Sequence, residues 1–353
     1  MASYILKRVL LMLPTLFGVM LVTFIVTQFV PGGPVEQLIG QLEGSGAGGG
    51  EVSSSATGLY RGDKGMEQEQ IEKLKVLYGF DKPAWQRFYE MMWSYMQLDL
   101  GESYFHNKSV VELIISKLPV SISLGAWSFL IIYLTCIPLG IKKAVRDGSK
   151  FDVVSSTVIL TGYAIPGFVL GLALLVLLGG GSFYDVFPLK GLTSDNWDEL
   201  PWYWQITDYL WHMVLPIIAM TVGSFAVLTM LTKNSFLEEI RKQYVLTARA
   251  KGLDESAVLY RHVFRNAMIP LITGFPAAFI TVFFTGSLLI ETIFSLDGLG
   301  LLSYDSIIKR DYPVVLGSLF FYTILGLFAK LLADVSYVMI DPRIQFDSVD
   351  KAS

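Results

Sequence analysis

The sequence predicts an all-α integral membrane protein with six transmembrane helices. Of its 353 residues, 53% are hydrophobic and only 16% are charged, whereas soluble domains carry about a quarter charged residues. The mean hydropathy is +0.52, and six apolar stretches are each long enough to cross a bilayer. We expect each stretch to be helical, because a strand exposed to lipid would leave backbone polar groups unpaired. The alternation typical of a membrane barrel is absent.

The first apolar stretch, Val9–Val30, follows Lys7 and Arg8 and at first sight resembles a signal peptide. It is longer than the usual signal-peptide core of about 7–15 apolar residues, and no small-residue cleavage pattern follows it. We therefore expect a retained first transmembrane helix. The other five predicted spans are Val120–Ile141, Val153–Leu178, Met213–Leu231, Ile269–Ile290 and Val314–Ile340.

The placement of lysine and arginine predicts that both termini are cytoplasmic. The short outer loops would then hold only Lys190, Lys309 and Arg310. The inner segments would hold most of the remainder, including Lys142, Lys143, Arg146, Lys150, Lys233, Arg241 and Lys242. This asymmetry is the usual pattern of inner-membrane proteins. The lysines and arginines of the long segment Pro31–Pro119 say little about orientation, because long segments are translocated largely regardless of charge.

These spans divide the chain into residues 1–30, an outer segment 31–119, a core 120–340 with an inner loop 233–268, and a tail 341–353. In the outer segment, Gln41–Gly65 is rich in glycine and serine and is expected to be a flexible loop. Met66–Tyr78 shows helical charge patterning and Trp85–Leu98 is amphipathic and aromatic. Both favour a small helical periplasmic cap against the membrane surface.

Composition argues against several classes of protein. The net charge of −4 lacks the basic excess typical of nucleic-acid binders. One cysteine, Cys136, and three widely separated histidines offer no disulfide framework and no metal site. The sequence has no glycine-rich phosphate loop ending in lysine and serine or threonine. We expect no catalytic, cofactor-binding or metal-ligating residues in this chain.

Charged residues inside the predicted spans are nearly limited to Lys330 and Asp334, which are spaced to pair on one face of the sixth helix. A proton-coupled carrier would be expected to show more acids at membrane depth. A transporter without a proton relay and without its own ATP site would need a partner protein that hydrolyses ATP. The rival readings are a membrane enzyme, a gradient-driven carrier and a scaffold that transports nothing.

The inner loop Lys233–Met268 is long for a connector. Within it, Ala248 and Ala250 would lower the steric profile of a short helix, and Gly252 fits the end of that helix. A small-faced helix ending in glycine can dock in a groove on another protein, whereas the simpler alternative is an ordinary surface helix.

Several motifs together resemble the dipeptide and oligopeptide ABC transporter permeases, and the resemblance covers most of the chain. The residues that carry it are Leu13-Pro14-Thr15, Gly18, Pro31-Gly32, Leu98-Asp99-Leu100-Gly101-Glu102-Ser103, Thr247-Ala248-Arg249-Ala250-Lys251-Gly252-Leu253, His262, Arg265-Asn266-Ala267, Pro270, Ile290-Glu291-Thr292-Ile293-Phe294, Gly298-Leu299-Gly300, Arg310-Asp311-Tyr312-Pro313 and Asp341-Pro342-Arg343. Within the family, the long glycine/serine insert, Tyr78–Pro83 and Met230–Leu237 are most similar to the Yej-type branch, which is implicated in uptake of oligopeptides and of the peptide antibiotic microcin C.

The resemblance implies the permease fold of a type I ABC importer in a bacterial inner membrane. It implies as partners a second permease, an ABC ATPase that binds ATP and Mg²⁺, and a periplasmic peptide-binding protein. The residues it assigns to ATPase coupling are Thr247, Ala248, Arg249, Ala250, Lys251, Gly252, Leu253 and Asp254. The sequence departs from the general importer pattern, which begins with Glu-Ala-Ala, by having Leu246-Thr247-Ala248, and Asp297 stands where many relatives have proline.

The wall of the transport path is less clearly marked. Phe283, Phe284, Thr285 and Ser287 in the fifth span could line a path for peptides, although frequent aromatics are more often lipid-facing or core residues. The pair Gly167 and Gly171 allows close approach of two helices, and simple packing is its expected role. Glu291 could hydrogen-bond across a subunit interface or remain solvated at the outer end of the fifth span.

Overall fold

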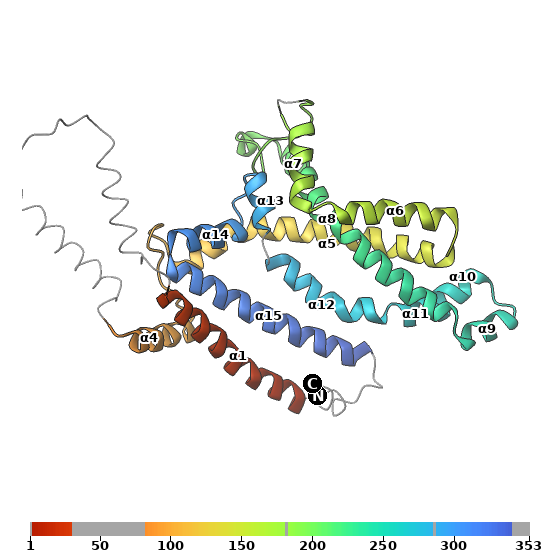
Figure 1. Ribbon diagram of the computed structural model, residues 1–353, viewed down its shortest axis with the longest axis horizontal. Coiled ribbons are helices and arrows are strands. Elements are labelled where there is room, and N and C mark those ends of the chain that lie inside the picture. The colour runs from red at the N-terminus through yellow and green to blue at the C-terminus, as the bar shows by residue number, and fades with distance from the viewer. Residues whose placement is uncertain (1, 30–81, 181–182, 285–286, 341–353) are drawn as a thin grey trace, which may run out of the picture. The chain divides into compact units, whose positions relative to one another are not determined.

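The computed structural model describes residues 2–29, 82–180, 183–284 and 287–340 (Figure 1). The described residues are mainly helical, and no strand occurs among them beyond two isolated bridges. The predicted glycine/serine loop, the helix over Met66–Tyr78 and the tail 341–353 lie outside the described residues.

Among the described residues, four helices are long and apolar enough to cross a membrane: α1 (Ala2–Phe29), α5 (Val110–Val145), α8 (Trp202–Ile240) and α15 (Tyr312–Ile340). They correspond to the first, second, fourth and sixth predicted spans. Pro14, Pro119, Pro138 and Pro216 lie inside the first three of them. These interior prolines do not end the helices, as membrane helices often tolerate.

The third predicted span is not one continuous helix. It is divided into α6 (Lys150–Ala164) and α7 (Gly167–Leu178), which bend by 92° at the break, so that α7 turns away from α6 (Figure 1). Ile165 has an extended conformation, with φ −89° and ψ 120°. The reason is that the ring of Pro166 disfavours helical geometry in the residue before it. The prediction of a straight helix over Val153–Leu178 was therefore wrong.

The fifth predicted span is also interrupted. α12 (Ile269–Phe284) has 16 residues, fewer than the roughly 20 that a helix needs to span the hydrocarbon. The short helix α13 (Leu288–Ile293) begins only after residues 285–286, which are not described. By length and composition the described part has four spanning helices, or five if the bent pair counts as one span. Six spans thus remain a prediction.

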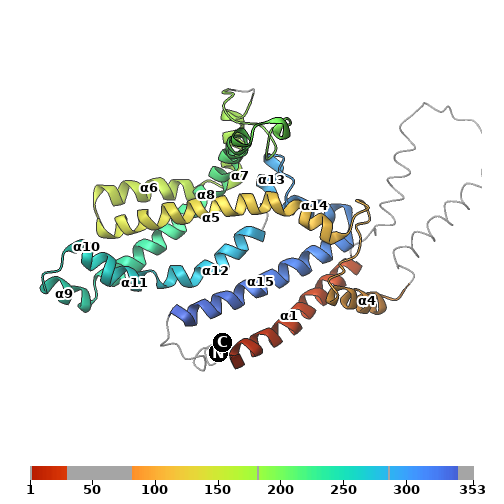
Figure 2. The same cartoon turned by 180° about the vertical axis from the view of Figure 1, so that it is seen from behind.

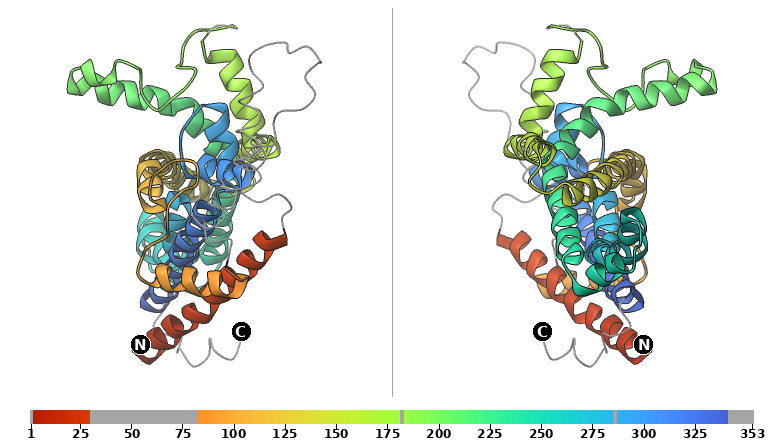
Figure 3. Two further views of the ribbon diagram at one scale, coloured as in Figure 1. Left: turned by 90° about the vertical axis from the view of Figure 1, so that its left-hand side faces the viewer. Right: turned by 90° about the vertical axis from the view of Figure 1, so that its right-hand side faces the viewer.

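The chain forms two compact units, of which one comprises residues 11–116 and 303–323. Here α4 (Ala84–Met96), the helix expected over Trp85–Leu98, packs on α1 (Figure 3). The ring of Phe88 lies 5.5 Å from that of Phe17 and 5.2 Å from that of Phe24. The bond between Lys82 and Glu90 holds the pKa of the Glu90 carboxyl below its usual value. Phe88 is therefore the aromatic contact of α4 with α1, whereas Trp85, Tyr89 and Trp93 of the same helix are exposed.

The other unit comprises residues 1–10, 117–302 and 324–353. Within it α6 and α7 both pack on α8, and α6 returns beside α5 (Figures 1 and 2). A β-carbon at Gly167 would lie 2.7 Å from the carbonyl oxygen of Ala219, and one at Gly171 would lie 3.3 Å from the Ala219 β-carbon. The glycine pair thus serves packing of α7 on α8. In the same unit Asp334 pairs with Arg8 at 3.3 Å rather than with Lys330, which the sequence suggested.

Candidate functional site

The segment Thr247–Asp254, which the family resemblance assigns to ATPase coupling, begins in a separate short helix beyond the end of α8. Lys242 has an extended backbone, with φ −73° and ψ 151°, and precedes α9 (Gln243–Ala250). Gly252 then takes φ +79°, a conformation that glycine adopts without the penalty of a side chain. The predicted helix stop at Gly252 is confirmed. Asp254 caps α10 (Glu255–Ala257) by accepting a hydrogen bond from the Ser256 amide at 3.1 Å.

Three further elements complete what we call the α9–α11 lobe, residues 243–267. After α10 come η2, a π-helix over Val258–Val263, and α11 (Phe264–Ala267). One apolar cluster holds the lobe together and attaches it to α5 and α8. Its buried members are Ala144, Phe236, Val245, Ala248, Val258, Val263 and Ala267. A π-helical turn is rare and is often found at functional sites.

The two faces of α9 differ. Val245 and Ala248, three residues apart, point into the cluster, and Ala248 is only 6% exposed. The sequence placed Ala248 and Ala250 together on the outward surface. The structure instead uses the small side chain of Ala248 for internal packing. Leu246, which is 49% exposed, and Ala250 point outward from the same side of α9, since they are four residues apart.

Several charged residues in and beside the lobe form ion pairs or hydrogen bonds. Arg249 pairs with Glu255, with Nε 2.9 Å from Oε1. Glu239 at the end of α8 receives hydrogen bonds from Lys242 and, at 2.6 Å, from the hydroxyl of Tyr244. The bond to Glu239 raises the pKa of Lys242, and burial followed by the same carboxylate raises the pKa of Tyr244. The hydrogen bonds from Ser256 hold the pKa of Asp254 below its usual value. The outward face offered by α9 is consequently more apolar than its sequence suggests.

A cavity of about 310 Å³ lies between the lobe and the ends of α5 and α8. Its walls include Val145, Ile240, Arg249, Ser256 and Tyr260. Ala144, Val258 and Val263, which belong to the apolar cluster, also border this cavity.

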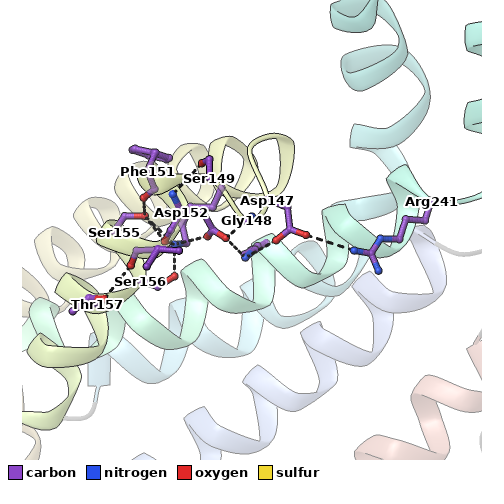
Figure 4. A network of polar contacts seen from close by, with 12 residues as sticks. Asp147, Gly148, Ser149, Phe151, Asp152, Ser155, Ser156, Thr157 and Arg241 are labelled. Carbon is purple, nitrogen blue, oxygen red and sulfur yellow. Dashed lines mark hydrogen bonds and ion pairs between the residues drawn. The ribbon is translucent and has the colours of Figure 1, made fainter.

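A network of ion pairs lies beside this attachment (Figure 4). Lys143, near the end of α5, is fully buried, and its ammonium lies 2.9 Å from Oδ1 of Asp152 in the first turn of α6. The same ammonium donates to the carbonyl oxygen of Asp152 and to the hydroxyls of Ser155 and Ser156. The buried charge is thereby compensated, as buried charges must be.

The network continues from α6 to α8. Lys233 Nζ lies 2.7 Å from Asp152 Oδ2 and 2.9 Å from Asp147 Oδ1. Asp147 in turn lies 3.5 Å from Arg241, the residue that ends α8 (Figure 4). This network was not predicted from the sequence, where the lysines served only to assign the orientation of the chain in the membrane. The signal available was a pair of acids, Asp147 and Asp152, in a segment otherwise rich in lysine and arginine.

Other residues of the resemblance also come together. The Ser103 hydroxyl donates to Asp311, uniting the motif at residues 98–103 with the one at 310–313. Glu291 is fully buried rather than solvated, and its Oε2 accepts a hydrogen bond from the Leu301 amide at 2.7 Å. His262 is exposed on η2. Among the described residues, no group of three or more histidine, cysteine or acidic side chains could hold a metal ion.

The pore residues predicted from sequence are only partly described. Ser287 precedes α13, and its carbonyl oxygen accepts from the Glu291 amide. Thr285 and the side chains of Phe283 and Phe284 lie outside the described residues. The structure thus brings the coupling residues together in one lobe and leaves the pore residues as a prediction.

Comparison with known proteins gives a consistent result. Residues 136–346 match the family described as the binding-protein-dependent transport system inner membrane component. The chain is 56% identical to the peptidoglycan transport system permease protein YejB of Agrobacterium fabrum, over 99% of this chain and 100% of that one. It is 52% identical to the inner membrane ABC transporter permease protein YejB of Escherichia coli O157:H7, over 98% and 100%. It is 31% identical to the dipeptide transport system permease protein DppB of Escherichia coli K12, over 98% and 99%.

Proposed function

Because the chain belongs to the family of binding-protein-dependent transport system inner membrane components, we propose that it forms, with a second permease, the path of an ATP-driven oligopeptide importer. The chain is a multi-pass inner-membrane protein and a permease component of a binding-protein-dependent peptide importer. Beyond this family-level description, the proposal specifies a second permease as partner, ATP hydrolysis as the energy source and oligopeptides as the substrate. It also includes six spans with both termini in the cytoplasm.

The observation that carries the proposal is the division of α9 into two faces. Val245 and Ala248 fasten the helix to α5, α8 and the rest of the lobe. The opposite face exposes Leu246, and Leu253 beyond the helix end is 39% exposed. An apolar strip on a short helix that is fixed from behind suits insertion into a groove of a partner. The partner would be the ABC ATPase, and the coupling segment would be Thr247–Asp254.

The mechanism follows from that placement. ATP and Mg²⁺ would bind the ATPase, and this chain would catalyse no reaction. Closure of the ATPase on ATP would displace the α9–α11 lobe and shift the spans from an inward-open to an outward-open arrangement. Such a change is a two-state equilibrium biased by nucleotide. A periplasmic binding protein would deliver the peptide, and Phe283, Phe284, Thr285 and Ser287 would line its path.

The relatives suggest two substrate classes. One relative is named for dipeptide transport, and another is named for peptidoglycan transport. Both names are compatible with recognition of a peptide backbone, which peptidoglycan fragments share with oligopeptides. We propose oligopeptides as the substrate, with peptide antibiotics such as microcin C as further cargo. Peptide-bearing fragments of peptidoglycan are the second candidate, and competition between the two classes in an uptake assay would rank them.

The energy source separates the proposal from a gradient-driven peptide carrier. Uptake by the complete transporter in sealed vesicles is expected to be inhibited by vanadate and to persist when a protonophore collapses the proton gradient. Uptake that is lost with the protonophore and unaffected by vanadate would instead favour the carrier.

The docking face is tested by purifying the tagged chain from membranes in mild detergent and asking whether an ATPase comes with it. We expect wild type to retain the ATPase and Leu246→Asp to lose it. Leu189→Asp is the matched control, because Leu189 is 50% exposed but lies in the loop after α7, away from the lobe. Gly252→Asp would be less informative, because an aspartate at φ +79° is strained whatever the docking face does. An ATPase retained by Leu246→Asp would refute the docking assignment.

A further inference from the structure

The ion-pair network joins three helices at the point where the α9–α11 lobe is attached. Its members are Lys143 of α5, Asp147 between α5 and α6, Asp152 of α6, Lys233 of α8 and Arg241 at the end of α8. The side chains of its inner residues are almost fully enclosed, with 0% of Lys143, 7% of Asp152 and 13% of Lys233 exposed. The outer two, Asp147 and Arg241, reach the surface.

Stability alone is a weak reason for this arrangement. Removing charges from water costs about as much as their attraction returns, so a buried ion pair is often no better than apolar side chains of similar size. What a buried pair can supply is a fixed relative position, because each charge loses its compensation if the helices slide. Here Asp152 pairs with Lys143 on one side and Lys233 on the other, so α5, α6 and α8 are fixed to one another through a single carboxylate.

The network lies next to the residues that attach the α9–α11 lobe. Lys143 is followed directly by Ala144, which packs in the apolar cluster with Val245 and Ala248 of α9. Arg241 stands two residues before α9 begins. Lys242, whose backbone is extended, joins α8 to the lobe. The network and the apolar cluster therefore flank this joint from two sides.

We propose that Lys143, Asp147, Asp152, Lys233 and Arg241 form a positioning clamp that makes the turn between α5 and α6 move as one body with the end of α8, which carries the α9–α11 lobe. The clamp deepens the proposed coupling function and rests on it. Without the clamp, a push on the lobe would slide the end of α8 past α5 and α6. With it, the same push displaces the ends of α5 and α6, and so reaches the membrane helices.

The clamp can be tested by measuring one distance within the complete transporter in nanodiscs. The only cysteine, Cys136, is replaced by alanine, and spin labels are placed on the exposed residues Arg146 and Arg261, both outside the proposed coupling segment. The distance distribution is recorded by pulsed electron paramagnetic resonance, without nucleotide and with ATP and vanadate. In wild type we expect one narrow distance that is the same in both states.

Lys233→Met removes the central charge and keeps a side chain of similar length, and we expect it to broaden the distance distribution. Lys233→Arg should restore a narrow one. Lys142→Met is the matched control, because Lys142 lies one residue from Lys143 but contacts the Phe151 ring and takes no part in the ion pairs. Should Lys233→Met fail to fold, Asp147→Asn removes only the outer, partly exposed link and should broaden the distribution as well. The proposal would be overturned if Lys233→Met and Asp147→Asn both kept a narrow distance distribution. It would also be overturned if the wild-type distance differed between the nucleotide-free state and the state with ATP and vanadate.

A functional readout separates the clamp from a merely stabilising network. With the ATPase still co-purifying, the Lys233→Met transporter should hydrolyse ATP but move about fivefold less peptide per ATP, within the range that coupling residues show. An unchanged ratio would contradict the clamp while leaving the docking face intact. Loss of the ATPase from Leu246→Asp tests docking alone, so the two proposals fail in distinguishable ways.

Discussion

The carboxyl group of Glu291 occupies the space that a side chain at position 298 would need. A β-carbon built on Gly298 would lie 2.6 Å from the carboxyl carbon of Glu291 and 2.7 Å from Oε1. The turn between α13 and α14 (Leu299–Lys309) folds around this carboxyl group. The Leu296 amide donates to the Glu291 carbonyl oxygen, and the Leu301 amide donates to Oε2, each at 2.7 Å. Glycine at 298 is therefore required by close approach rather than by a turn conformation.

Gly298→Ala should lower the stability of the protein in detergent, because overpacking a filled site costs about 1–3 kcal/mol. A fluorescence-based thermal unfolding assay would measure the loss. Gly274→Ala is the matched control, since a β-carbon at Gly274 meets nothing within 4 Å. The double variant Gly298→Ala/Glu291→Ala should cost less than the sum of the two single variants, because the second change removes the obstacle of the first. Additive costs would contradict the shared volume.

Ser103 and Asp311 lie 208 residues apart in sequence and are joined by a hydrogen bond of 2.5 Å. Ser103→Ala would leave the fully buried Asp311 with the Tyr104 amide, at 3.1 Å, as its remaining hydrogen-bond donor. We expect a loss of about 1–3 kcal/mol, the usual cost of an unsatisfied buried group. Hydrogen exchange of residues 100–113 should rise together with the fall in melting temperature. Thr207→Ala, which removes an exposed hydroxyl from α8, should change neither.

Ala248 and Ala250 differ in surroundings although both belong to the same short helix. Ala248→Leu should loosen the α9–α11 lobe, because Ala248 is buried in its apolar cluster and overpacking a buried site costs about 1–3 kcal/mol. Ala250→Leu should leave the lobe folded, because Ala250 is exposed. Limited proteolysis between residues 243 and 267 would report the difference. Equal cleavage of both variants would show that α9 does not sit as described.

The sequence alone predicts the parts of this fold that depend on local composition. Long apolar runs predicted α1, α5, α8 and α15, and Gly252 predicted the end of α9. The bend before α7 was not predictable from proline, since Pro138 and Pro216 lie inside unbroken helices while Pro166 ends one. Pro166 is accompanied by the packing of α7 on α8 through Gly167 and Gly171, a tertiary contact that the presence of a proline does not reveal.

The candidate site divides in the same way. The motif over residues 247–253 overlaps α9, the proposed coupling helix, but nothing in its spacing showed that Ala248 faces inward. The inward face packs against Val258 and Val263, the first and last residues of a rare π-helical turn. The ion pairs among Lys143, Asp152 and Lys233 join residues up to 81 positions apart, so charge patterning within any single helix could not reveal them.

Close approach of α7 to α8 provides the last prediction. A β-carbon at Gly167 would lie 2.7 Å from the Ala219 carbonyl oxygen, a backbone atom that cannot give way without moving α8. Gly167→Ala should therefore separate the two helices and lower the melting temperature in detergent. Gly223→Ala, on α8 where a β-carbon meets nothing within 4 Å, is the matched control and should be neutral or stabilising, because alanine favours helix over glycine by about 1 kcal/mol. If Gly167→Ala were as stable as wild type, α7 would have to be held on α8 by contacts other than this small-residue face.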